Sequence, residues 1–115
     1  QIFSGDDGLN MDILRLGAQG AISVLSNLLP ATLTRMWKAW QTGDAETADA
    51  LFAATEPVVE ACFRETNPIP TKELLSLMGL CTHDARLPLV PALDETRTWL
   101  RDFHDATLAP LLEAE

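Results

Sequence analysis

The position of its β-strands is the feature that most limits what this chain can fold into. Only two segments have the character of strands, and both lie within the first 25 residues. Segment 1–4 is apolar at its centre and is ended by a Gly-Asp-Asp-Gly sequence. Segment 20–25 has no clean polar alternation, which is typical of a parallel strand buried on both faces. A helical pattern lies between the two. The order strand, helix, strand, helix therefore predicts βα units of a parallel sheet or barrel.

From residue 26 onwards the sequence predicts helices and connecting segments only. Ser26 or Asn27 is expected to cap a Trp-rich helix that ends at Gly43. One apolar face of this helix is predicted to carry Leu29, Leu33, Met36, Trp37 and Trp40. Asp44 is expected to open a longer helix, whose inward face continues to Phe63. Pro57 lies inside that pattern and should kink it, because proline removes one backbone donor and crowds the preceding turn.

The last half of the chain carries two proline-bounded links, at 67–70 and 86–91. Both are expected to be extended, because a proline disfavours helical backbone in the residue before it. A short helix over 71–78, stopped by Gly79, is predicted between them. Asp94 is expected to cap a last helix that carries Trp99 and Phe103 on one face.

Two strands do not make a stable parallel sheet, which needs cover on both faces. Hydrophobic residues make up 47% of the chain, which has three Trp, four Phe and many Leu but no Tyr. We therefore expect further strands from another copy or fragment, unless the strand predictions fail. The chain begins at Gln1 without a methionine. We interpret this start as an edited or proteolysed end of a strand already under way.

The charge excludes some classes of protein. Seventeen acidic residues against eight basic ones give a net charge of −9, unsuited to binding nucleic acid or an anionic membrane. No signal peptide and no apolar run of about 18 residues is present, so a cytoplasmic location is expected. Cys62 and Cys81 lack metal-site spacing and are expected to be inert thiols. His83 and His104 are isolated and expected at the surface. We expect no metal site and no cofactor.

Few residues are candidates for chemistry. Asp6 and Asp7 follow the first strand, where a barrel would place its active site, but a helix-capping role explains them more simply. Lys72 lies near a helix N-terminus, which favours a neutral amine, yet nothing else nearby sets it apart from an exposed lysine. Lys38, the other lysine, has no better claim. Taken alone, these residues do not form a complete site.

Four segments in order nevertheless match one family. Ser-Gly-Asp-Asp at 4–7, Gly-Ala-Ile-Ser-Val at 20–24, Asn-Pro-Ile-Pro-Thr-Lys at 67–72 and Arg-Leu-Pro-Leu at 86–89 resemble the closing third of dihydrodipicolinate synthase. The resemblance implies a (β/α)8 TIM barrel with a C-terminal helical extension. Residues 1–43 would be the last two βα units and residues 44–115 the extension.

The resemblance also implies a function. The family is a class I aldolase-type lyase that condenses pyruvate with L-aspartate semialdehyde through a lysine Schiff base, in lysine and diaminopimelate biosynthesis, and it is usually a homotetramer. Gly5 and Ile22 match positions beside the pyruvate pocket. Lys72 matches a structural lysine. The Schiff-base lysine belongs to earlier strands, so this chain is expected to hold no catalytic residue and to be inactive alone.

Departures from the family pattern keep alternatives open. Thr71 replaces the usual Val, and residues 25–29 differ from the common sequence, which loosens the choice of aldehyde. The chain would then belong to another pyruvate-dependent aldolase or lyase of the same superfamily. A different alternative is a non-catalytic helical interaction module that presents its Trp-rich faces to a partner.

Overall fold

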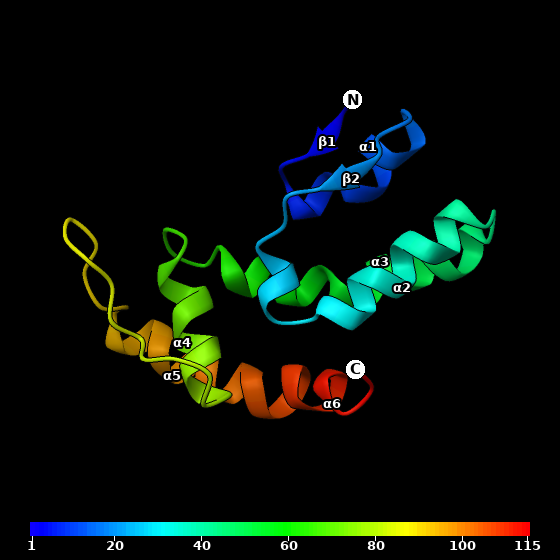
Figure 1. Cartoon of the computed structure of the whole chain (residues 1–115). Helices are drawn as coiled ribbons and strands as arrows, with labels where there is room; N and C mark the ends of the chain where they lie inside the picture. The colour runs from blue at the N-terminus through cyan, green and yellow to red at the C-terminus, as the bar shows by residue number, and fades with distance from the viewer. The chain divides into compact units, whose positions relative to one another are not determined.

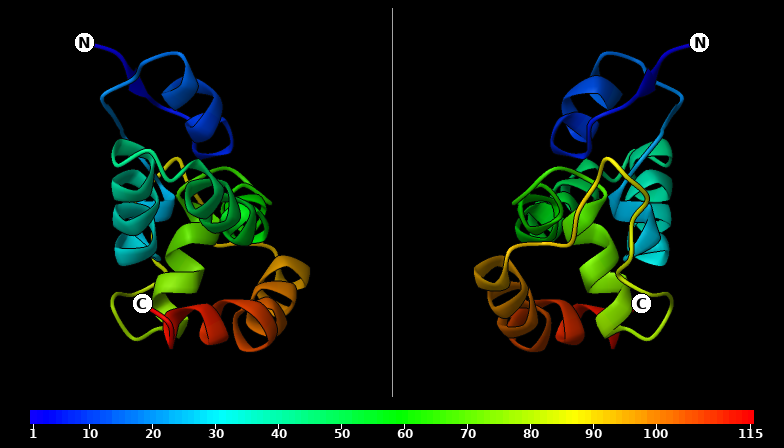
Figure 2. Two further views of the ribbon diagram at one scale, coloured as in Figure 1. Left: turned by 90° about the vertical axis from the view of Figure 1, so that its right-hand side faces the viewer. Right: turned by 90° about the vertical axis from the view of Figure 1, so that its left-hand side faces the viewer.

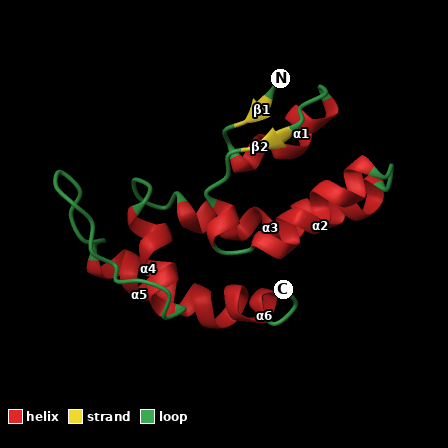
Figure 3. Ribbon diagram, viewed as in Figure 1, coloured by secondary structure: helices red, strands yellow, loops and turns green.

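The computed structural model describes all 115 residues, most of which are helical (Figure 3). The chain divides into two compact units, which we call region 1 (residues 1–59 with Glu115) and region 2 (residues 60–114). Region 1 begins with β1 (Phe3–Ser4), the 3-10 turn η1 (Asp7–Leu9), α1 (Asn10–Arg15), β2 (Gly20–Ala21), the 3-10 turn η2 (Leu25–Asn27) and α2 (Pro30–Gln41). After α3 (Ala45–Cys62), region 2 holds α4 (Ile69–Leu77), α5 (Asp94–Phe103), the π-helical η3 (His104–Leu108) and α6 (Ala109–Leu112).

The two strands form a parallel pair, as predicted (Figure 1). Phe3 pairs with Gly20, and Ser4 pairs with Ala21. The second strand is shorter than expected, since it ends at Ala21 and residues 25–27 turn into η2. The burial on both faces predicted for 20–25 is wrong for this chain, because Gly20 and Ala21 are only half-buried and Ile22 is exposed.

The core of region 1 lies between its helices. Helices α2 and α3 run side by side, in every view (Figures 1 and 2). The apolar face predicted for the Trp-rich helix is confirmed, because its residues pack on buried side chains from α1 and α3. The buried cluster is Met11, Leu14, Met36 and Ala48, with Leu33, Trp37, Ala39, Trp40, Leu51 and Phe52 packed against it.

The start of α2 differs from the prediction. Ser26 and Asn27 lie in η2 and do not cap α2, whose preceding residue makes no side-chain capping bond. Instead, the side-chain carboxylate of Glu115 accepts hydrogen bonds of 2.8 Å from the backbone N–H groups of Ala31 and Thr32. A residue 83 positions away thus takes the place of a local cap.

The start of α3 is as predicted. The Asp44 carboxylate accepts a hydrogen bond of 3.1 Å from the Thr47 N–H group, after Gly43 with a φ of 85°. The helix continues through Pro57 as one element. The inward face ends earlier than expected, because α3 stops at Cys62 and Phe63 follows it with 49% exposure.

Both proline-bounded links turn instead of extending. The Ile69 N–H group donates to the Thr66 carbonyl over 3.0 Å, and the backbone then enters α4, which has a proline in its first turn. The Leu89 N–H group donates to the Arg86 carbonyl over 3.1 Å. The extended conformation predicted for 67–70 and 86–91 is therefore wrong at these turns.

Helices α4 and α5 pack together in region 2. Asp94 is the first residue of α5, and the preceding Leu93 makes no side-chain cap, so the predicted capping role is wrong. The predicted aromatic face is present. The Trp99 and Phe103 rings stack with centroids 5.1 Å apart, and the Arg64 guanidinium lies 4.1 Å from the centre of the Trp99 ring.

Candidate functional site

The predicted site residues Gly5 and Ile22 come directly after β1 and β2. The strands are parallel, so both residues leave the sheet at the same edge, the carboxyl edge. The Ile22 N–H group donates a hydrogen bond of 2.7 Å to the Ser4 carbonyl, which extends the pairing past Ala21. Ile22 is 76% exposed. The structure therefore brings the two predicted residues to one edge and leaves that edge open.

The two adjacent aspartates at this edge have different roles. Asp6 is exposed, and its Oδ1 atom accepts a hydrogen bond of 2.9 Å from the Gly8 N–H group, which is the predicted cap. Asp7 is 3% exposed and bonds outside its own turn. Its Oδ2 atom accepts hydrogen bonds from the N–H groups of Val24 (2.8 Å) and Leu25 (2.9 Å).

The other carboxylate oxygen of Asp7 is also bonded. The Asn10 Nδ2 group donates to Asp7 Oδ1 over 3.1 Å. Asn10 is itself buried, and its own Oδ1 atom has no hydrogen-bond partner. Sequence reasoning missed this cluster. The capping interpretation considers only neighbours in the chain, whereas the partners of Asp7 after β2 are 17 and 18 residues away.

The first turn after β1 is fixed by Ser4 as well. Ser4 is completely buried, and its hydroxyl donates a hydrogen bond of 2.9 Å to the Asp6 carbonyl. Because the Ser4 carbonyl accepts from Ile22, this one residue bonds both the turn after β1 and the backbone after β2.

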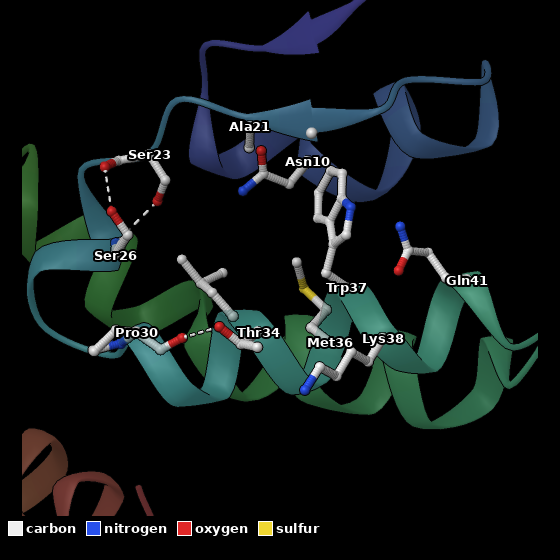
Figure 4. A pocket seen from close by; sticks show the side chains of 12 residues that line it. Asn10, Ala21, Ser23, Ser26, Pro30, Thr34, Met36, Trp37, Lys38 and Gln41 are labelled. Carbon is white, nitrogen blue, oxygen red and sulfur yellow. Dashed lines mark hydrogen bonds between the residues drawn. The ribbon is translucent and has the colours of Figure 1, made fainter.

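A cavity of about 490 Å³ is lined by β2, the residues that follow it, and α2 (Figure 4). Ala21 and Ser23 line it but Ile22 does not, as expected when successive side chains alternate in direction. Lys38 is its one charged lining residue, and no carboxylate, thiol or imidazole joins it. The cavity has no acid–base pair. Its lining residues are Asn10, Gly20, Ala21, Ser23, Ser26, Pro30, Leu33, Thr34, Met36, Trp37, Lys38 and Gln41.

Lys72 lines a separate cavity of about 640 Å³ in region 2, with Arg86 and Asp84. Its ammonium donates a hydrogen bond to the Asp84 backbone carbonyl. This contact joins α4 to the following loop and agrees with the structural role that the sequence favours. No carboxylate, thiol or imidazole side chain other than that of Asp84 lines this cavity.

The remaining candidates do not gather into a site. Cys62 is buried and Cys81 exposed. The His104 side chain is 18% exposed, and its Nδ1 atom lies 2.8 Å from the Asp105 carboxylate. No cluster of three or more histidine, cysteine or acidic residues able to hold a metal ion is present. No helix has the length and apolar character that crossing a membrane requires.

Known proteins resemble this chain along most of its length. A 4-hydroxy-tetrahydrodipicolinate synthase of Methanosarcina barkeri is 45% identical over 97 residues, which are 84% of this chain and 33% of the relative. The crystal structure of dihydrodipicolinate synthase from Thermotoga maritima matches with a TM-score of 0.88 and 36% identity, over 93% of this chain and 36% of that one.

A further structure is that of a chloride-inhibited dihydrodipicolinate synthase from Acinetobacter baumannii in complex with pyruvate. It matches with a TM-score of 0.83 and 34% identity, over 92% of this chain and 37% of that one. The chain thus spans about a third of the length of the relatives it matches. The sequence model of the dihydrodipicolinate synthetase family matches residues 1–106. This chain belongs to the dihydrodipicolinate synthetase family.

Proposed function

We propose that this chain is the C-terminal part of a 4-hydroxy-tetrahydrodipicolinate synthase. The whole enzyme would condense pyruvate with L-aspartate semialdehyde through a lysine Schiff base, as a cytoplasmic homo-oligomer in lysine and diaminopimelate biosynthesis. Family membership and the names of the relatives support the class of reaction. The observation that carries the proposal is the bond from Ile22 to Ser4, which puts Gly5 and Ile22 at one edge of a parallel pair.

In this proposal, residues 1–43 are the last two βα units of a (β/α)8 barrel. The order β1, α1, β2, α2 and the parallel pairing support it. Residues 44–115 are the helical extension. Gly5 and Ile22 offer backbone beside the pyruvate, in agreement with the rule that barrel enzymes bind substrate at the carboxyl edge of the strands.

The chain alone is proposed to lack the nucleophile. Lys38 and Lys72 are its only lysines. Lys72 donates a hydrogen bond to the Asp84 carbonyl, and Lys38 is exposed to water. A Schiff-base lysine needs a neutral amine, which burial or a neighbouring cation usually provides. Neither lysine is buried, and the cavity that Lys72 lines holds the Asp84 carboxylate beside the Arg86 cation.

Reductive trapping tests the proposal. The 115-residue chain is incubated with pyruvate and borohydride, and intact mass is measured for a reduced pyruvate adduct. We expect no adduct on the chain alone, and an adduct when the whole enzyme is used or when the N-terminal portion is added and reassociates. The adduct should then lie outside residues 1–115.

A Lys72→Arg variant, and separately a Lys38→Arg variant, control for each lysine. An adduct on the wild-type chain that disappears in Lys72→Arg would contradict the proposal. The choice of aldehyde is tested in the whole enzyme. Turnover with L-aspartate semialdehyde supports the synthase, whereas turnover only with another aldehyde would assign the chain to a different pyruvate-dependent aldolase.

A further inference from the structure

We propose that Asp7 is a positioning residue that holds Gly5 and Ile22 at a fixed separation beside the pyruvate. This inference rests on the proposed function, because it concerns the geometry of the same pocket. Asp7 lies two residues after Gly5, and its partner Val24 lies two residues after Ile22. The carboxylate therefore joins the two backbone segments that the proposed pocket uses.

The Asp7 carboxylate connects the turn after β1 to the loop after β2 by hydrogen bonds. One carboxylate oxygen accepts the adjacent N–H groups of Val24 and Leu25 at 2.8 and 2.9 Å, where the chain enters η2. Hydrogen bonds to an ionised acceptor are about twice as strong as those between neutral groups. Because these bonds reach across 17 and 18 residues, they set the position of the loop after β2 relative to the turn after β1.

Asn10 shows that the cluster is arranged around the Asp7 carboxylate. The Asn10 Nδ2 group donates to Asp7, and the Asn10 Oδ1 atom is left buried without a partner. A buried acceptor without a hydrogen bond costs about 1–3 kcal/mol. If the Asn10 amide were rotated, its oxygen would face the Asp7 carboxylate. Two acceptors would then be in contact, which is less favourable than one unpaired oxygen. The unpaired oxygen is thus tolerated to keep a third donor on Asp7.

Asp7 does not contact substrate in this geometry. It is 3% exposed, and both of its oxygens are occupied by donors from the chain. Without it, the bond from the Ile22 N–H group to the Ser4 carbonyl would still join the two loops. That bond lies before Val24, so the segment after Ile22 would lose its anchor.

The test uses the whole enzyme that carries this chain, with Asp7→Ala, Asp7→Asn and the control Asp12→Asn. Asp12 is an exposed carboxylate on α1, paired with Arg15. We expect Asp7→Ala to raise the KM for pyruvate about tenfold or more, because small misplacements of binding groups have large effects on rate. Asp7→Asn keeps one oxygen for Val24 and Leu25, so it should restore most of the loss. Asp12→Asn should stay within about twofold of wild type.

Hydrogen–deuterium exchange of the peptide that covers residues 22–28 gives a second measurement. Exchange should be faster in Asp7→Ala than in wild type, and unchanged in Asp12→Asn. A lower melting temperature with an unchanged pyruvate KM would make Asp7 merely structural and overturn the proposal. If Asp7→Ala does not fold, Asp7→Asn takes its place: a raised pyruvate KM together with faster exchange at 22–28 supports the proposal, and an unchanged KM overturns it.

Failure of the proposed function is recognised separately. If the wild-type whole enzyme is not trapped by pyruvate and borohydride, the proposed function is wrong. Hydrogen–deuterium exchange then tests the loop-positioning role by itself. Faster exchange at 22–28 in Asp7→Ala alone supports that role, and equal exchange in all variants overturns it.

Discussion

Each of the two regions buries one carboxylate, and the two are held in different ways. Asp7 in region 1 is 3% exposed and accepts two backbone N–H groups and one side-chain amide. Glu73 in region 2 is 7% exposed, and its Oε1 atom lies 3.3 Å from Arg97 Nε. That ion pair lacks good hydrogen-bond geometry, since Oε1 has no hydrogen-bond partner.

The two carboxylates stabilise different parts of the fold. Backbone N–H groups are fixed by the path of the chain, so Asp7 determines where two loops lie. Arg97 is a side chain on α5 that reaches Glu73 on α4, so this pair joins two helices. We therefore expect changes at Asp7 to act mainly on the proposed pocket, and changes at Glu73 or Arg97 to act mainly on the stability of region 2.

The largest effect on stability is expected from Arg97→Met. This variant removes the cation and leaves the Glu73 carboxylate buried without a partner. Breaking a buried pair costs about 3–5 kcal/mol. Because the Arg97 side chain is 37% exposed, water screens part of that cost, and a loss of about 2 kcal/mol is expected. Urea unfolding followed by circular dichroism measures it.

The double variant Glu73→Met with Arg97→Met is the control for this comparison. It replaces both partners by apolar side chains of similar length, so no charge remains buried. Most of the lost stability should return. A double variant as unstable as Arg97→Met would show that Arg97 acts through packing of its stem.

A structural feature could be predicted from the sequence when its interacting residues lie close together in the chain. The two strands, the Gly43 stop and the Asp44 cap follow from local patterns, and the structure has all of them. The Asp7 contacts reach 17 or 18 residues and the Glu115 cap 83, and a local pattern contains no signal for either.

The proline-bounded links failed for another reason. Proline restricts its own φ and disfavours helical backbone in its predecessor, and these preferences favour an extended chain. At residues 66–69 a backbone hydrogen bond closes a turn, and the following residues fit the first turn of α4, where a proline loses no bond. The local preference was therefore outweighed by the start of a helix. The exposed strand residues show the same dependence on context, because their predicted burial requires strands that this chain does not contain.

A smaller effect is expected from Arg64→Met in region 2. The Arg64 guanidinium lies 4.1 Å from the centre of the Trp99 ring, which stacks on Phe103. Exposed contacts of this kind contribute about 0.5–1 kcal/mol. The loss should be seen in urea unfolding, and the matched variant Arg101→Met, an exposed residue of α5, should lose less. Equal losses in the two variants would assign the effect to net charge.

A still weaker effect is expected at Glu115, a second carboxylate of region 1 that accepts hydrogen bonds from backbone N–H groups. Partial burial pushes the pKa of Glu115 up. Hydrogen bonds from Thr32 and Ala31 and the charge of Arg35 outweigh burial, so the pKa is lowered from its usual 4.5. A lowered folded-state pKa contributes stability that is present above pH 4.5 and is lost as the pH falls through the folded-state value.

Glu115→Gln should therefore cost about 0.5 kcal/mol at pH 7, because the carboxylate is largely exposed and its cap is screened by water. The difference from wild type should shrink as the pH falls below 4.5 and the wild-type carboxyl takes up its proton. Urea unfolding at a series of pH values measures this, with Glu113→Gln as the control, since Glu113 is exposed and caps no helix start. A difference as large at pH 3 as at pH 7 would mean that the side chain acts through shape. The cap on α2 would then differ in kind from the buried carboxylate of Asp7, whose role depends on accepting the N–H groups of Val24 and Leu25.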